Sequence, residues 1–214
     1  MSLIISDKYK YIFFHLPKNA GVSVSSYLIK QELKLSIKKS IDYFRSFIYG
    51  KNNNFYITKN LEIINFNSHI TCFNFFKLFD EKLFDDYFKF AVVRNPFDRA
   101  VSRYEYTKKI SKQFKNFSFE DFLVYDLKNN LHVLNQYEFC TKDHNNICLE
   151  KVIKFENLNE ELNEISKNIF KKNHKIQHLN KTSRNHYREY FNTKTINLIK
   201  KNLFKDLEYF NYEF

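Results

Sequence analysis

The chain of 214 residues contains few of the residues that usually interrupt a fold: two glycines, two prolines and three cysteines, with no tryptophan. No apolar run approaches the roughly 20 residues that a membrane-spanning helix needs. Asp7, Lys8 and Lys10 interrupt the N-terminal stretch where a signal peptide would have its apolar core. We therefore expect no transmembrane segment and no cleaved leader, and we expect a cytoplasmic protein.

The cysteines show no metal-binding pattern. Cys72, Cys140 and Cys148 are odd in number and lack CxxC spacing, and no nearby cluster of histidines and carboxylates completes a zinc-like set. They are interpreted as reduced, partly buried thiols. We expect no metal in the functional site.

Apolar, aromatic and basic residues are abundant. With 43% hydrophobic and 19% aromatic residues, the chain can bury one sizeable core, so residues 1–214 are expected to form a single domain. The 35 Lys and Arg residues exceed the 24 Asp and Glu residues, which gives a net charge of +11. This field attracts anions such as nucleotides, acidic glycans, nucleic acid or membrane surfaces, but it does not choose among them.

Three of the four glycines and prolines fall in two short segments, one around Pro17 and Gly21 and one at Pro96. Each segment follows an apolar run and precedes a helical pattern, which indicates two strand-turn-helix units of an α/β protein. The first unit is predicted as a strand over Tyr9–Leu16 and a helix over Ser23–Leu33. The second is predicted as a strand over Phe88–Val93 and a helix over Asp98–Ile110, with Pro96 in its first turn.

The rest of the chain reads as further strands and mainly helices. We expect an α/β fold with a central, mainly parallel sheet flanked by helices and with a P-loop-like phosphate-binding loop. Residues 34–60 are basic and rich in Asn, which is typical of an insertion or loop. The remaining predicted strands are Leu61–Phe66 and Lys151–Phe155, and the predicted helices are Asn74–Phe84, Phe119–Asn129, Leu131–Phe139, Leu158–Phe170 and Thr193–Phe204.

The first segment, residues 16–23, has the features of an anion-binding loop. A loop between a strand and a helix directs backbone N–H groups and the positive end of the helix dipole at a ligand. Gly21 permits close approach, Lys18 supplies an ammonium group and Ser23 a hydroxyl. It is not a Walker A loop, because that motif places Lys after its second Gly. Taken alone, the segment also fits an ordinary helix start with a solvated lysine.

The second segment places Arg94 at the carboxyl end of a predicted buried strand, where ligands bind in open α/β sheets. Ser102 follows two turns into the next helix. A guanidinium and a hydroxyl suit a phosphate monoester. In the alternative interpretation, Arg94 pairs with Asp98, and the two later arginines of this helix, Arg99 and Arg103, form a solvated face.

Together, the two segments resemble the sulfotransferases that use 3′-phosphoadenosine-5′-phosphosulfate (PAPS), in the branch that contains many carbohydrate sulfotransferases, the family 2 type. Residues 13–23 read FFHLPKNAGVS and residues 92–104 read VVRNPFDRAVSRY, in the family's order. Further matches extend the resemblance from about residue 10 to the end. They are Ser68-His69, Gln136-Tyr137, residues 155–158, residues 178–184 and residues 206–212.

The resemblance implies roles for residues of both segments. Lys18 would hold the bridging oxygen of the phosphosulfate, and Gly21, Val22 and Ser23 would cradle the 5′-phosphate. Three loop residues depart from the family's usual pattern. Asn19 stands where Thr or Gly is usual, Ala20 where Gly is usual, and Val22 where Thr is usual. Contacts through backbone N–H groups should survive these changes. Four residues would contact the donor elsewhere: Arg94 and Ser102 at the 3′-phosphate, with Ser183 and Arg184 from a late loop.

The acceptor hydroxyl needs a base. His69 is our candidate, because imidazole titrates near neutral pH and similar sulfotransferases place a histidine after the second strand. In the alternative interpretation, His69 is a structural histidine held by packing or by a backbone carbonyl group. Glu105 and His132 are the reserve candidates for the base. His15 is interpreted as structural. The implied acceptor is a carbohydrate or glycan, including acidic glycans, and the sequence indicates no oligomeric state.

Two other classes of protein fit parts of the pattern. A P-loop kinase would share the strand, loop and helix, but the lysine precedes the glycine and no convincing carboxylate pair for Mg²⁺ is evident. A single-stranded nucleic-acid-binding protein would use basic and aromatic residues together. Because the aromatic residues mostly occupy apolar positions of predicted strands and helices, core packing explains them more simply, and we expect no nucleic-acid partner.

Overall fold

The computed structural model describes residues 3–34, 56–58, 61–64, 69–171 and 184–214. The chain divides into two compact units. The sheet unit comprises Met1–Val93 and Cys140–Lys181, and the helical unit comprises Arg94–Phe139 and Thr182–Phe214. Each unit is built from two separate stretches of chain. The expectation of a single domain over residues 1–214 stays a prediction.

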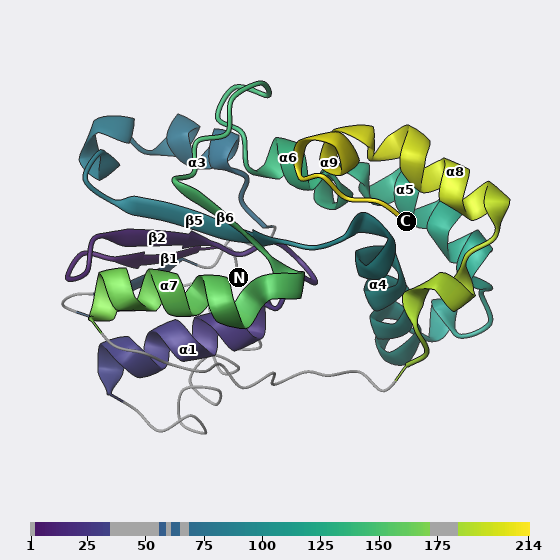
Figure 1. Ribbon diagram of the computed structural model, residues 1–214, viewed down its shortest axis with the longest axis horizontal. Helices are drawn as coiled ribbons and strands as arrows, with labels where there is room; N and C mark the ends of the chain where they lie inside the picture. Colours follow the sequence, from purple (N-terminus) through teal and green to yellow (C-terminus); the bar gives the residue numbers. More distant parts are fainter. Residues whose placement is uncertain (1–2, 35–55, 59–60, 65–68, 172–183) are drawn as a thin grey trace. The chain divides into compact units, whose positions relative to one another are not determined.

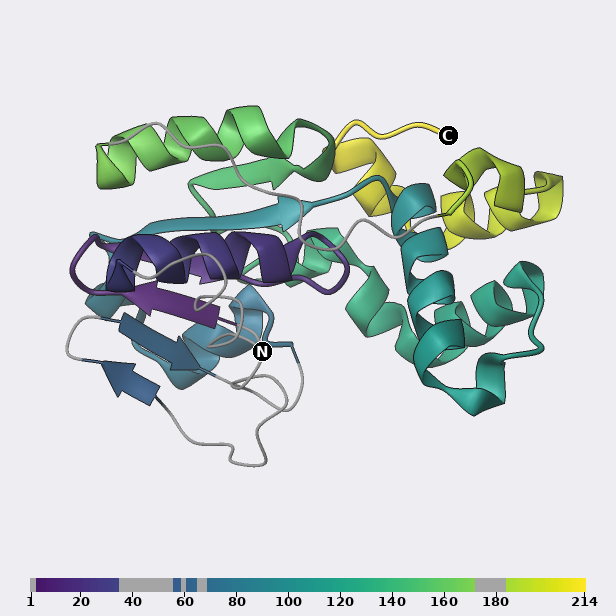
Figure 2. The ribbon, with the colours of Figure 1, turned by 90° about the horizontal axis from the view of Figure 1, so that it is seen from below.

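The described residues of the sheet unit contain one sheet with the order β3-β4-β1-β2-β5-β6 (Figure 1). The neighbours β2, β5 and β6 run parallel, whereas β1 pairs antiparallel with β2 and β4, and β3 pairs antiparallel with β4 at the edge (Figure 2). The single α/β sheet was predicted, but its parallel part is confined to these three neighbours and β1 was not foreseen. The strands are β1 (Leu3–Ser6), β2 (Tyr11–Phe14), β3 (Tyr56–Thr58), β4 (Leu61–Ile64), β5 (Phe88–Val93) and β6 (Lys151–Lys154).

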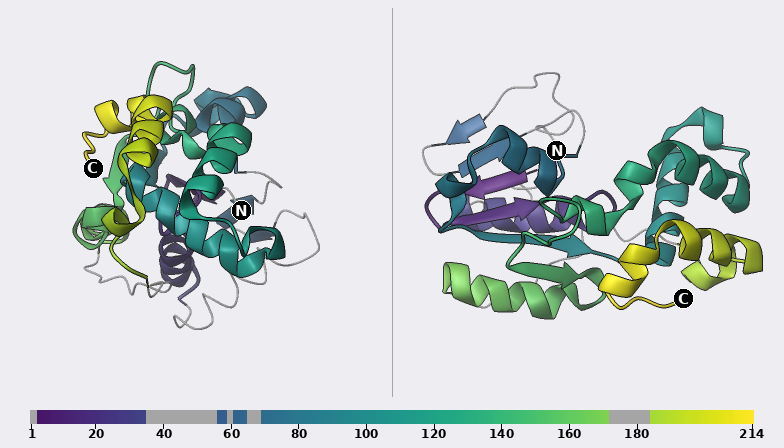
Figure 3. Two further views of the ribbon diagram at one scale, coloured as in Figure 1. Left: turned by 90° about the vertical axis from the view of Figure 1, so that its right-hand side faces the viewer. Right: turned by 90° about the horizontal axis from the view of Figure 1, so that it is seen from above.

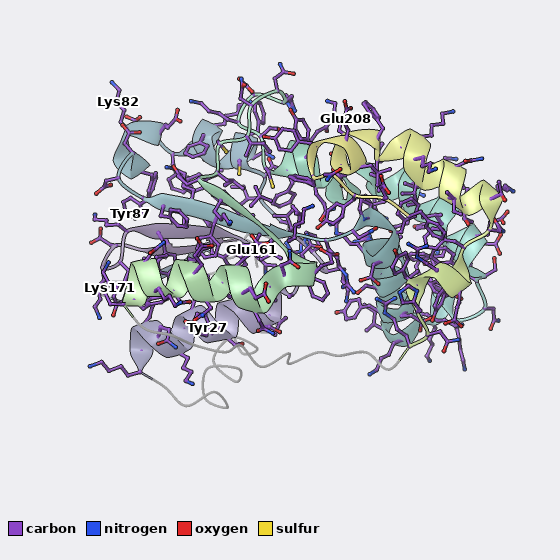
Figure 4. All side chains as sticks on the ribbon, viewed as in Figure 1. Tyr27, Lys82, Tyr87, Glu161, Lys171 and Glu208 are labelled. Carbon is purple, nitrogen blue, oxygen red and sulfur yellow. The ribbon has the colours of Figure 1, made fainter. Side chains whose placement is uncertain are left out.

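Helices cover both faces of this sheet. Since successive side chains of a strand point to opposite faces, Phe13 packs with the buried residues of α1 (Gly21–Leu33) and α7 (Leu158–Phe170). Its neighbour Phe14 contacts Phe75 of α3 (Cys72–Leu78) on the other face, with ring centroids 5.4 Å apart. The hydroxyl of Tyr27 on α1, which is labelled in Figure 4, donates to Ser166 Oγ of α7 at 2.7 Å. This hydrogen bond ties the two helices together.

The helical unit begins directly after β5. Pro96 opens α4 (Pro96–Ile110), and the Asn95 side chain caps it by accepting from Phe97 N. Apolar residues of α4, α5 and α8 form one core. Figure 3 shows the ribbons of these helices in two further views. The other helices of this unit are α5 (Phe119–Leu134), α6 (Gln136–Phe139), α8 (Thr193–Asn202) and α9 (Phe204–Tyr209), and short 3₁₀ turns lie at Lys112–Phe114 and Tyr187–Tyr190.

Several predicted elements match the structure closely. Strand β5 has the predicted bounds. Helix α5 is interrupted by the non-helical backbone of Asn130, which lies between the predicted helices Phe119–Asn129 and Leu131–Phe139. The predicted helix over Asn74–Phe84 is instead α3 followed by a 3₁₀ turn at Glu81–Phe84, because Asp80 caps a new turn there. Of the segment 34–60, only residue 34 and β3 lie within the described residues. A further 3₁₀ turn, Phe155–Asn157, leads into α7.

Candidate active site

The loop that joins β2 to α1 has an unusual backbone. Lys18 and Ala20 have φ of 66° and 57°, in the left-handed region that costs a residue with a Cβ about 1 kcal/mol or more. Ala20 is also the N-cap of α1, and its side chain makes no capping hydrogen bond. The same holds for α7 and α9, whereas side chains cap α3, α4, α5 and α8. The first N–H groups of α1 therefore have no side-chain acceptor at the N-cap, which favours an anion at this helix end.

Asn19 holds this loop against the sheet. Its side chain is buried, and Nδ2 donates to the carbonyl oxygen of Val92 at 2.7 Å. Val92 lies near the carboxyl end of β5, so the hydrogen bond links the loop to that end of the sheet. The sequence placed Asn19 among the residues that contact the donor. The structure adds that its side chain fixes the loop, and the contact with the donor stays a prediction.

Gly21 makes room for His15. A Cβ built on Gly21 would lie 1.7 Å from His15 Nε2, a distance that no side chain tolerates. His15 follows β2, is only 8% exposed and stands with its ring against the start of α1. Burial, with His69 nearby as a second cause, lowers the pKa of His15 well below its ordinary value. Sequence reasoning explained Gly21 by the approach of an anion and missed this packing, which depends on residues six apart.

His69 is oriented by the same segment. Its Nδ1 lies 2.9 Å from the carbonyl oxygen of His15, and the two rings meet edge to face with centroids 5.3 Å apart. A carbonyl oxygen can only accept, so Nδ1 carries the proton and the neutral ring keeps its lone pair on Nε2. His69 is partly buried and stands two residues before Thr71, the N-cap of α3. This arrangement leaves Nε2 as the nitrogen able to accept a proton.

In the helical unit, two arginines share one carboxylate. Arg94 donates from Nε to Asp98 Oδ2 at 2.7 Å and pairs with the same oxygen through Nη2 at 2.6 Å. Arg184 pairs with the other oxygen, Oδ1. Its Nη1 is buried, and no hydrogen-bond partner is found for it among the described residues. Two guanidinium groups around one carboxylate leave an excess of positive charge, which suits a phosphate group.

The alternative interpretation of this segment is therefore half right. Arg94 does pair with Asp98, but Arg99 and Arg103 do not form a solvated face. Arg99 is 2% exposed and donates to the carbonyl oxygen of Leu134 at 2.6 Å. Arg103 makes two hydrogen bonds of 2.7 Å to the buried carboxylate of Asp126. Both side chains hold α4 in the helical unit.

The remaining predicted donor contacts are only partly described. Ser102 is 7% exposed and lies four residues after Asp98, on the same face of α4. Ser23 is buried in the first turn of α1, whereas Val22 is partly exposed there. Ser183 lies outside the described residues. Its neighbour Arg184 lies within the described residues and pairs with Asp98.

The reserve bases lie in the helical unit. Glu105 Oε1 accepts from the Tyr190 hydroxyl at 3.0 Å, and the His132 side chain lies outside the described residues. In the sheet unit, the structure thus places His15 and His69 beside the loop that carries Lys18. In the helical unit, it brings Arg94 and Arg184 together at Asp98, with Ser102 one helical turn after Asp98 on α4. His15 and Asp98 are the two residues of these clusters that the sequence did not assign to the site.

Within the parts of the chain that the structure describes, no helix is long and apolar enough to cross a membrane. No group of three or more His, Cys, Asp or Glu side chains is placed there to hold a metal ion. The three cysteines are free thiols.

Comparisons with known proteins agree with the two motifs. The model of the family described as the sulfotransferase family matches residues 1–213. The chain is also 34% identical over 93 residues to an uncharacterized protein of Archaeoglobus fulgidus, an alignment that covers 42% of this chain and 72% of that protein. The family match includes the loop, His69, Arg94 and Arg184. The resemblance predicted from the sequence is confirmed, and the chain belongs to the sulfotransferase family, whose activity is the transfer of sulfuryl groups.

Proposed function

We propose that this chain transfers the sulfuryl group of PAPS to a hydroxyl of a carbohydrate or glycan, with His69 as the base, and that residues 1–214 act as one sulfotransferase domain. The observation that carries the choice of donor is the pair of arginines around Asp98. Such a cluster suits a phosphate monoester, and the 3′-phosphate distinguishes PAPS from ATP-like nucleotides. PAPS supplies the sulfuryl group and leaves as 3′-phosphoadenosine-5′-phosphate (PAP).

The phosphosulfate end of the donor fits the loop before α1. Its left-handed backbone and the N-cap without a side-chain acceptor support a P-loop-like role, in which N–H groups from residues 19–23 bind the 5′-phosphate. Lys18 would neutralise the charge that grows on the bridging oxygen as the bond from sulfur to that oxygen breaks. Transfer is then an in-line displacement in which alignment and electrostatics lower the barrier.

The acceptor end fits His69. As the acceptor oxygen bonds to sulfur, its proton must leave. Because Nδ1 of His69 donates to the His15 carbonyl oxygen, the lone pair of the neutral ring that can accept this proton is on Nε2. His15 itself is disfavoured as the base, because burial lowers its pKa and its ring is packed against Gly21. Its proposed role is to orient the base, because its carbonyl oxygen accepts the hydrogen bond from Nδ1 of His69.

The proposal of a carbohydrate acceptor is supported by the resemblance to carbohydrate sulfotransferases and by the net charge of +11. That charge favours an acidic glycan over a neutral one through long-range attraction, which salt would weaken. The cytoplasmic location likewise stays a prediction from the sequence.

A transfer assay tests this proposal. The protein is incubated with PAPS labelled in its sulfuryl group and with a panel of neutral and acidic oligosaccharides, and labelled products are separated from donor. We expect label in a glycan hydroxyl with PAPS and not with adenosine 5′-phosphosulfate, which lacks the 3′-phosphate. Lys18→Met keeps the length of the side chain without its charge and should abolish transfer. Equal transfer from both donors would contradict the assignment of PAPS, and label confined to non-carbohydrate acceptors would contradict the acceptor class.

A further inference from the structure

Arg94 stands where the backbone pairing of the sheet ends. Strand β5 ends at Val93, which pairs with Lys154 as the last residue pair between β5 and β6. The peptide groups of Arg94 therefore need partners from outside the strand ladder, since buried backbone groups are nearly always hydrogen-bonded.

Gln136 provides these partners. Arg94 N donates to Gln136 Oε1 at 2.9 Å, and Gln136 Nε2 donates to the carbonyl oxygen of Arg94 at 2.8 Å. One carboxamide thus binds both backbone groups of Arg94, as a neighbouring strand would. Gln136 is fully buried at the start of α6. Two hydrogen bonds from one planar group fix both the position and the direction of the Arg94 backbone.

Asp206 of α9 fixes the orientation of that carboxamide. Its Oδ2 accepts from Gln136 N at 3.0 Å and from Gln136 Nε2 at 3.1 Å, while Oδ1 accepts from Tyr137 N at 2.7 Å. Both oxygens of Asp206 face backbone N–H groups and therefore accept hydrogen bonds. The donor Nε2 of Gln136 points toward Asp206 and the carbonyl oxygen of Arg94, which leaves Oε1 for the N–H of Arg94.

The side chain of Arg94 is held separately. Asp98 binds its guanidinium, as described above, so Gln136 positions the backbone and Asp98 the charged end. Arg99 is also buried, and its positive charge favours the ionised form of the Asp206 carboxylate. All of these residues belong to the helical unit and come from α4, α6, α9 and the residues just before α4.

We infer that Gln136 and Asp206 are positioning residues for recognition of the 3′-phosphate: Asp206 orients the Gln136 carboxamide, which clamps the backbone of Arg94 so that its guanidinium meets that phosphate. This inference rests on the proposed function of Arg94. A displacement of about 1 Å at such a residue is enough to weaken alignment strongly. It also gives a role to two motifs, Gln136-Tyr137 and the segment 206–212, that the proposed function left without one.

The test uses the full chain at pH near neutrality and two ligands that differ only in the 3′-phosphate, PAP and 5′-AMP. Gln136→Met keeps the side-chain length without hydrogen-bonding groups. Asp206→Asn replaces one acceptor oxygen by a donor that faces the N–H groups of Gln136. The matched control is Asp126→Asn, since Asp126 is also a buried carboxylate of the helical unit but binds Arg103 and Asn130. The unfolding free energy of each variant is measured in parallel.

We expect Gln136→Met and Asp206→Asn to lower the preference for PAP over 5′-AMP by about tenfold, which corresponds to about 1.4 kcal/mol, with 5′-AMP binding unchanged. Asp126→Asn should lose stability and keep the wild-type preference. If the two variants lose stability but keep that preference, or lose affinity for both ligands in parallel, the network is only structural and the inference is wrong. If the wild type itself shows no preference for PAP, the proposed role of Arg94 fails, and this inference fails with it.

Discussion

At the scale of single residues, His15 links three parts of the sheet unit. Its ring packs against the start of α1 and its carbonyl oxygen binds His69. The residue follows β2 directly, so a shift of the loop would alter the orientation of His69, the proposed base. Residues 13–23 therefore contain both the proposed phosphate loop and His15, which orients His69 from another segment.

The contact between Gly21 and His15 predicts a specific clash. Gly21→Ala places a Cβ where the His15 ring lies, and such overpacking costs about 1–3 kcal/mol. We expect Gly21→Ala to lower the free energy of unfolding by this amount in chemical denaturation. The double variant His15→Ala with Gly21→Ala should be more stable than the sum of the single changes predicts. Additive losses would show that the clash is not with His15.

His15 also predicts a dependence of stability on pH. Because burial lowers its pKa in the folded protein, the unfolded chain binds more protons here once the pH is below about 6.5. The stabilising contribution is thus complete above about pH 6.5 and is lost as the pH falls from there toward the folded-state pKa. Denaturation of the wild type and of His15→Gln, at several values from about pH 7.5 to about pH 5.5, should show a steeper loss for the wild type.

The control for this experiment is His144→Asn, which changes a histidine at an exposed turn with φ of 66°, a conformation that Asn tolerates. Asp206 has a raised pKa and contributes with the opposite sign, since its stabilisation is present at low pH and is lost as the pH rises toward about 6. That contribution is common to all three proteins and cancels in the comparison. Identical slopes for the wild type and His15→Gln would contradict the account of His15.

His69→Asn separates the orientation of the base from its chemistry. The Asn Nδ2 can still donate to the His15 carbonyl oxygen, but no proton acceptor replaces Nε2. With the acceptor that the transfer assay identifies, kcat should fall by about 10²–10⁴-fold, while the Kd for PAP stays unchanged. A kcat close to that of the wild type would exclude His69 as the base and direct the same test to Glu105 and His132.

At the scale of elements, the parts of the fold with strong local signals were predictable. β5 is an apolar run that only Lys89 interrupts, and Pro96 opens α4, so both elements have nearly the predicted positions. β1 was missed because a four-residue strand followed by Asp7 and Lys8 carries no glycine or proline signal. Two contacts could not be read from the sequence, that of Gln136 with the backbone of Arg94 and that of Arg184 with Asp98. Gln136 and Arg184 lie 42 and 90 residues after Arg94 in the chain, and only tertiary packing brings them to this site.

The left-handed backbone at Ala20 predicts that replacing alanine by glycine there has the opposite effect on stability to the same replacement inside α4. Ala20 has a left-handed backbone, so Ala20→Gly should raise the free energy of unfolding by about 1 kcal/mol. Ala100 lies inside α4, where Ala100→Gly should lower it by about 1 kcal/mol. PAP binding should survive Ala20→Gly, because the proposed contacts are backbone N–H groups. A loss of stability in Ala20→Gly would contradict the strained loop.

At the scale of the whole molecule, successive stretches of the chain belong alternately to the sheet unit and to the helical unit. The proposed 5′-phosphosulfate loop belongs to the sheet unit, whereas the proposed 3′-phosphate residues belong to the helical unit. Residues 93 and 94, which are adjacent in sequence, belong to different units. Family membership was predictable because both motifs are continuous in sequence, but the division of the proposed donor-binding residues between two units was not.

The central claim is that this sulfotransferase recognises the 3′-phosphate of its donor through Arg94. Calorimetric titration with PAP and with 5′-AMP tests it most directly, on the wild type, Arg94→Ala, Lys18→Ala and the control Arg188→Ala, whose exposed guanidinium binds the carbonyl oxygen of Phe214. We predict tight binding of PAP by the wild type and the control, with the preference for PAP lost in Arg94→Ala and kept, at lower affinity, in Lys18→Ala. Equal affinity of the wild type for PAP and 5′-AMP would contradict the claim.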